Sequence, residues 1–232
     1  MNGDYLIYYM IVGGFTVIGM LLSGRLKSKF NYYSQHQLSN GLSGQEIAQQ
    51  MLDEAGINDV QIVRGKGFLT DHYNPKTQTV SLSPPVFDGR SISSAAVAAH
   101  ECGHAIQHAE SYGMLQMRSN LVPYVKFASM AQGYLLMFAL GMAGAMPGLL
   151  LVTIGAFAVT TLFSVVTLPV EFDASNRAMD WLEDSGMTTA EEHDGAKDAL
   201  WWAAMTYVSA ALSSFALLLF LVFKYMQGQG RR

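Results

Sequence analysis

The sequence is poor in charge, in cysteine and in any excess of basic residues. Asp, Glu, Lys and Arg make up 14% of its 232 residues, whereas soluble domains carry about 25%, so much of the chain is too apolar for a soluble protein. The single cysteine, Cys102, excludes an intramolecular disulfide framework. The formal net charge of −4 argues against a nucleic-acid partner, because binding to phosphates needs a basic surface.

Four apolar segments are long enough to cross a membrane. Residues 5–22 carry no charge, and at about 1.5 Å per residue they approach the ~30 Å thickness of a bilayer core. No Asp, Glu, Lys or Arg occurs between Phe127 and Val170, which leaves room for two helices separated by a turn at AMPG (145–148). We therefore predict a mainly α integral membrane protein with about four transmembrane helices. The expected spans are residues 5–22, 122–145, 149–170 and 205–226.

Basic residues follow the first span directly. Arg25, Lys27 and Lys29 come after it, and no Lys or Arg precedes it. Because positively charged loops stay on the cytoplasmic side, we expect the N-terminus outside and residues 23–121 in the cytoplasm. The hairpin of the second and third spans then returns residues 171–203 to the cytoplasm.

The cytoplasmic segment begins with signals for a helix and two strands. Residues 43–57 predict an amphipathic helix in which Ser43 is the N-cap and Glu46 completes a capping box. VQIVRG (60–65) and TVSLS (79–83) alternate like short strands, and the YNPKTQ between them predicts a turn. We expect this β-hairpin and the helices around it to form a cytoplasmic, zincin-like catalytic domain.

An Ala-rich helix is expected over residues 91–113. Its N-cap candidates are Ser91 and Ser93, and Gly113 is expected near its end. The helix contains HECGH, which has the H-E-x-x-H pattern, followed by a third histidine, His108.

The H-E-x-x-H pattern has a physical basis when it lies on a helix. His100 and His104 differ by only about 40° around the axis and by ~6 Å along it, so both imidazoles can bind one Zn²⁺. Glu101 lies about 100° round from His100, beside the metal position. From there its carboxylate can take a proton from a zinc-activated water that attacks a peptide carbonyl.

Two histidines leave zinc short of a ligand. His108 continues the spacing, but it lies another ~6 Å along a straight axis and cannot close a tetrahedron, so we expect it to support or pack beside the site. The metzincin pattern fails as well, because it requires glycine where this chain has Gln107 and histidine where it has Glu110.

The third ligand is expected from LPVEFDASNRAMDWLEDSG (168–186), in which Pro169 can open a helix. Glu171 lies immediately after the third span. Two crossings separate it from His100, so both residues emerge on the same side of the membrane. The alternative role for Glu171 is a carboxylate favoured by the dipole at a helix N-terminus.

Four segments resemble a known family: DHYNPKTQTVSLSP, AAVAAHECGHAIQH, LPVEFDASNRA and ALWWAAMTYVSAAL. In this order, from about residue 43 to 215, the chain resembles the YugP-type zinc-dependent membrane proteases, which are described as neutral zinc metallopeptidases. The resemblance implies an integral membrane zinc metallopeptidase in which His100, His104 and Glu171 bind zinc and Glu101 is the catalytic glutamate.

The layout is also similar to that of the HtpX-type heat-shock proteases and the CAAX prenyl proteases. Those families place H-E-x-x-H, a helical hairpin and a glutamate ligand in this order. They carry an aspartate four residues after the glutamate, whereas this chain has Ser175. Asp173 is near in sequence but about 200° round a helix from Glu171. Which group orients the zinc histidines therefore stays open, with Ser175 one candidate.

Two further residues are candidates for contact with a substrate. His72 lies in the predicted hairpin, which could hold an extended peptide by β-addition; the simpler interpretation is an ordinary loop histidine. Arg177 lies within two helical turns of Glu171, where it could stabilise an oxyanion; the alternatives are a salt bridge and a guanidinium that faces lipid.

These features predict a membrane-embedded zinc metalloendopeptidase that hydrolyses peptide bonds of cytoplasmic or membrane-proximal segments, with Glu101 as general base. The alternative is a zinc-binding membrane scaffold without proteolytic activity, although binding alone needs no base. We expect zinc as cofactor, and the lipid bilayer and a protein or peptide substrate as partners, with membrane proteins among the candidate substrates. A regulatory membrane protein and a homo-oligomer are further candidate partners.

The expected protein is a multi-pass protein of the cell membrane whose active site faces the cytoplasm. The expected regions are an N-terminal anchor (1–22), a cytoplasmic catalytic region (23–121), a transmembrane hairpin (122–170), a cytoplasmic helical region with the third zinc ligand (171–203) and a C-terminal transmembrane helix with its tail (204–232).

Overall fold

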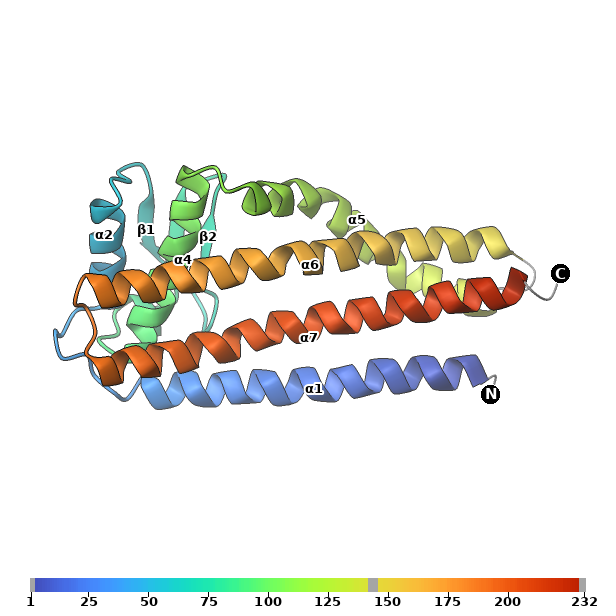
Figure 1. Ribbon diagram of the computed structural model, residues 1–232, viewed down its shortest axis with the longest axis horizontal. Helices are drawn as coiled ribbons and strands as arrows, with labels where there is room; N and C mark the ends of the chain where they lie inside the picture. Colours follow the sequence, from blue (N-terminus) through green and yellow to red (C-terminus); the bar gives the residue numbers. More distant parts are fainter. Residues whose placement is uncertain (1–2, 142–145, 230–232) are drawn as a thin grey trace. The chain divides into compact units, whose positions relative to one another are not determined.

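The computed structural model describes residues 3–141 and 146–229 and is mainly α-helical (Figure 1). The turn expected at AMPG begins outside the described residues. The described elements are α1 (Gly3–Tyr33), α2 (Gly44–Glu54), β1 (Gln61–Arg64), β2 (His72–Asn74), β3 (Thr79–Leu82), α3 (Pro84–Phe87), α4 (Ile92–Ala109), α5 (Gly113–Gly141), α6 (Pro147–Asp184) and α7 (Ala190–Gln229).

Three of the described helices are long and apolar enough to cross a membrane. The segments are Tyr5–Tyr33 of α1, Gly148–Asp184 of α6 and Ala190–Gly228 of α7. They support the prediction of a membrane protein. The remaining expected span, 122–145, falls on α5, which is not among these helices, and on residues outside the described part of the chain. The fourth span therefore stays a prediction.

The helices contribute to two compact units, of which the first is built from the apolar parts of the long helices. It combines α1 up to Leu21, residues Met117–Leu168 and the chain from Thr206 onward. Its buried cluster is apolar, and the members are Leu136, Ala139, Leu150, Phe157, Phe220 and Leu221. One polar contact joins α5 to α6 within this unit, because the Gln132 amide donates to the Ala156 carbonyl at 3.0 Å and to the Thr160 hydroxyl at 2.7 Å.

The second unit combines Leu22–Gln116 with Pro169–Met205. Its core joins α2, β3, α4 and the C-terminal part of α6 through buried side chains that include Ile47, Met51, Leu52, Val80, Leu82, Ala99, Cys102, Ala178 and Leu182. The capping box predicted for α2 is confirmed, since Ser43 and Glu46 bond reciprocally.

The sheet differs from the predicted hairpin in one respect. Both predicted strands exist, but they pair in parallel as β1 and β3. Strand β2 takes in the first two residues of YNPKTQ and pairs antiparallel with β3, and the strand order is β1-β3-β2. The sequence signal for β2 is weak because the strand has only three residues.

Two predicted helix boundaries are wrong. Helix α4 begins after the N-cap Ser91, as expected, but it ends at Ala109, and Gly113 begins α5. Ser111 takes the left-handed conformation (φ 58°) that glycine usually supplies, and the Tyr112 N–H closes the end by donating to the Gln107 carbonyl at 2.8 Å. Pro169 does not open a helix, because α6 continues through it.

Candidate metal centre

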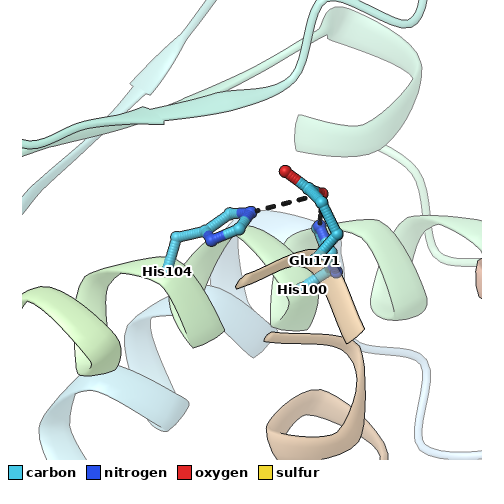
Figure 2. Close-up of side chains that lie close together, drawn as sticks. All are labelled: His100, His104 and Glu171. Atoms are coloured by element: carbon cyan, nitrogen blue, oxygen red, sulfur yellow. Dashed lines mark ion pairs between the residues drawn. The ribbon is translucent and has the colours of Figure 1, made fainter. Parts of the chain in front are cut away.

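Three side chains from α4 and α6 converge on one point in the second unit. His100 and His104 extend from one face of α4, and Glu171 of α6 lies opposite them (Figure 2). The Glu171 Oε2 atom is 3.4 Å from His100 Nε2 and 3.7 Å from His104 Nε2. One potential ligand atom from each residue lies within 4.8 Å of the others.

These separations fit a shared ion better than direct hydrogen bonds. An N–H···O bond joins atoms about 2.7–3.2 Å apart, which is shorter than both distances to Glu171. Two ligands of a tetrahedral Zn²⁺, each bonded at about 2.1 Å, lie about 3.4 Å from one another. Two imidazole nitrogens and one carboxylate oxygen are also a donor set that zinc favours. The residues present therefore fit the metal.

A glycine inside the motif sets the distance between the two ligand-bearing helices. A Cβ atom added to Gly103 would lie 2.6 Å from the Ala174 carbonyl oxygen and 3.1 Å from its Cα. The α4 and α6 backbones are thus in contact, and only a residue without a side chain fits between them. Ala174 stands between Glu171 and Ser175 in the sequence, so this contact brings both residues to the histidines.

Each histidine is held by its second ring nitrogen. His100 Nδ1 lies 3.1 Å from the Ser175 hydroxyl, and His104 Nδ1 lies 3.0 Å from the Gln107 side-chain oxygen. With both Nδ1 atoms engaged, the Nε2 atoms face Glu171. Such bonds fix the tautomer and the ring orientation of metal-binding histidines. Ser175, one of the sequence candidates, thus lies in an orienting position for His100.

Gln107 was not recognised from the sequence as a site residue. Its side chain is 0% exposed, and its amide donates to the Val170 carbonyl at 2.9 Å and to Asp173 Oδ2 at 2.7 Å. These bonds to α6 fix the side-chain oxygen toward His104. The sequence feature that could have identified Gln107 was its position three residues after His104, on the same face of a helix made mostly of small residues.

Arg177 extends this network away from the ligands. It pairs with Asp173 at 2.6 Å and with Glu110 at 2.7 Å. Of the roles considered for Arg177, the structure therefore shows the salt bridge. Asp173 contacts the site indirectly, because it accepts from both Gln107 and Arg177.

The surroundings of His104 favour positive charge. Burial lowers the pKa of its imidazole, but the carboxylates of Glu171 and Glu101 and the contact with Gln107 outweigh burial, and the net shift is upward. Glu101 itself is buried, with 8% of its surface exposed. Two carboxylates close to neutral nitrogen ligands provide the negative charge that a divalent cation requires.

The other two sequence-predicted histidines do not join the ligand group in the described structure. His108 Nδ1 lies 2.8 Å from the Tyr73 hydroxyl of β2, so it links α4 to the sheet. His72 is exposed on β2, and its Nδ1 lies 2.9 Å from the Thr70 carbonyl.

Comparisons with known proteins agree with this geometry. Residues 8–226 match the model of a family described as "Putative neutral zinc metallopeptidase". The chain is 42% identical over 205 residues to the "Putative membrane protease YugP" of Bacillus subtilis (strain 168), which covers 88% of this chain and 90% of the relative. No solved structure matches the chain. With the family model spanning most of its length and a triad suited to zinc in its fold, the chain belongs to the neutral zinc metallopeptidase family.

Proposed function

We propose that this zinc metallopeptidase is a membrane-embedded endopeptidase that cleaves cytoplasmic or membrane-proximal segments of proteins. The observation that carries the proposal is the convergence of His100, His104 and Glu171, with the separations expected around one metal ion and with Glu101 next to the first histidine. A scaffold that only binds zinc would need the three ligands but would not need Glu101.

The protein residues have separate tasks in this proposal. His100, His104 and Glu171 hold zinc, which when bound supplies the Lewis acidity that makes water a nucleophile near neutral pH. Glu101 accepts a proton from the attacking water at its carboxylate and delivers it to the nitrogen of the leaving amine. Ser175 and Gln107 keep the imidazoles in the orientation that presents Nε2.

An extended substrate has a docking place in the same unit. Strand β2 is at the edge of the sheet, and its Tyr73 contacts His108 on the helix that carries the motif. An extended peptide can add to such an edge through backbone hydrogen bonds. We therefore assign the β2 edge to substrate binding, with His72 at its exposed side.

The site also supports a four-span topology with the catalytic residues in the cytoplasm. His104 and Glu171 meet in one unit, so the chain between them crosses the membrane an even number of times. Because α6 contains a candidate span, the intervening α5 supplies the second crossing. The basic residues Arg25, Lys27 and Lys29 then place the site on the inner side.

The experiment combines metal content with proteolysis. In detergent, the wild-type protein is expected to hold one zinc per chain, and His104→Ala and Glu171→Ala are expected to lose it. Glu101→Gln is expected to keep the zinc but to cleave fluorescent casein about 10²–10⁴-fold more slowly. A Glu101→Gln protein with the wild-type rate would refute the assignment of the base. Zinc retained by Glu171→Ala would refute the third ligand.

A further inference from the structure

A short loop beside α1 exposes two large apolar side chains. The 66–70 loop (Lys66–Thr70) connects β1 to β2, and its Phe68 and Leu69 are 41% and 38% exposed. Leu69 has a φ of 55°, a left-handed conformation that leucine rarely adopts. The turn is closed by the Thr70 hydroxyl, which donates to the Lys66 carbonyl at 2.8 Å. A strained backbone that presents leucine to water would be doubly unfavourable, which indicates that another medium covers this tip.

The loop is packed against the part of α1 that follows its apolar segment. The Phe68 ring meets the buried Phe30 ring edge-on, with centroids 5.3 Å apart, and the ammonium of Lys27 lies 5.8 Å from the Phe68 centroid. Both partners belong to the same compact unit as the loop. The height of Phe68 along α1 is therefore fixed near residues 27–30.

That height corresponds to the headgroup layer of a bilayer. The uncharged segment of α1 ends at Gly24, and Lys27 follows it by about 4.5 Å along a helix. The polar region of each leaflet is about 5–7 Å thick. Phe and Leu side chains with lysines beside them are typical of segments that insert at this layer, and Lys27 and Lys66 would face its phosphates.

We propose that the 66–70 loop inserts Phe68 and Leu69 into the membrane surface next to α1, so that the second unit has a second lipid contact besides its long helices. The occupant of this surface is lipid. The loop is placed at the bilayer surface because α1, against which it packs, is itself long and apolar enough to cross the membrane. Because the loop leads directly into β2, the contact also holds the start of the proposed substrate strand at the bilayer surface.

The test uses the single native cysteine, which is buried. Leu69→Cys carries a nitroxide spin label, and the full-length protein is reconstituted in vesicles of phosphatidylethanolamine and phosphatidylglycerol. The matched control is Thr77→Cys, an exposed position in the turn at the far end of β2. Labelling of the wild-type protein measures any reaction at Cys102. Continuous-wave EPR then compares collisions with oxygen, which concentrates in lipid, and with a water-soluble nickel chelate.

A lipid-inserted loop gives a ratio of oxygen to nickel collisions several-fold higher at residue 69 than at residue 77. A ratio at residue 69 equal to that at residue 77 would overturn the proposal, as would a label that becomes protected only when another protein is added. Zinc content measured on the same samples shows that the labelled variants are folded. Neither result depends on proteolytic activity, so failure of this proposal and failure of the proposed function are distinguishable.

Discussion

Replacement of Gly103 by alanine should disturb the metal centre without touching a ligand. The added Cβ would lie 2.6 Å from the Ala174 carbonyl oxygen, whereas ordinary contacts begin at 3.4 Å. The α4 and α6 backbones must therefore separate by about 0.8 Å. Metal–ligand distances tolerate only about 0.2 Å. The separation would move Glu171 away from His100 and His104, because Glu171 and Ala174 lie on consecutive turns of α6.

The size of the effect follows from the cost of overpacking. Inserting a methyl group into a tightly packed contact costs about 1–3 kcal/mol. If the metal-bound state must restore the original spacing, that cost appears in the binding free energy, and zinc affinity falls about fivefold to 150-fold. The contact involves backbone atoms of Ala174, so Ala174→Gly should not rescue Gly103→Ala.

Competition with a chromophoric zinc chelator in detergent measures the change. Gly24→Ala is the matched control, because Gly24 is also inside a helix and an added Cβ there meets nothing within 4 Å. We expect the control to bind zinc like the wild type and to gain up to about 1 kcal/mol of helix stability. If Gly103→Ala binds zinc as tightly as the control, the close helix contact does not set the site geometry.

Further predictions concern the groups around the site, the metal and one helix cap. Gln107→Leu and Ser175→Ala should each weaken zinc binding about 10–100-fold, measured by the same titration; unchanged affinity in both would remove their orienting role. Zinc at a hundredfold excess over its Kd should stabilise the fold by about 2.7 kcal/mol, seen as a higher Tm that chelation reverses and that His104→Ala lacks. Hydrogen bonds from the Ser43 backbone and hydroxyl lower the pKa of the Glu46 carboxylate, so its contribution to stability is complete above its unfolded pKa and is lost as the pH falls through the folded value. Glu46→Gln should therefore lower Tm at pH 7 but not under acidic conditions, and a difference that persists in acid would contradict this account.

The features that depend on neighbours in sequence were predictable. The capping box at Ser43 requires only residues three positions apart, and the pairing of His100 with His104 requires only helical geometry. The predicted end of α4 was wrong, although it also depended only on neighbouring residues. Gly113 has the residue type expected at a helix end, yet Ser111 adopts the left-handed φ, and two hydrogen bonds from Ser111 and Tyr112 to the last turn stabilise it there.

Features that depend on how elements meet were not predictable in the same way. Strands that pair in parallel and strands of a hairpin show the same alternation of apolar and polar residues. The sequence therefore does not reveal that β1 pairs in parallel with β3. The role of Gln107 depends on Val170 and Asp173, which lie on a helix more than sixty positions later. From the sequence alone, Gln107 is one polar residue on an amphipathic helix, and only the contact between α4 and α6 makes it a buried partner of His104.

Glu171 was predictable from membrane topology rather than from local helix geometry. No spacing rule connects it with His104, but a ligand on the other side of a membrane could not reach the same ion. An even number of crossings between the two residues is therefore a condition that any candidate must meet. Glu171 meets it if α5 and α6 both cross, and its position 3.7 Å from His104 Nε2 is the observation from which we propose the second crossing by α5. The proposed four-span topology thus rests on the metal centre rather than on the hydropathy of α5.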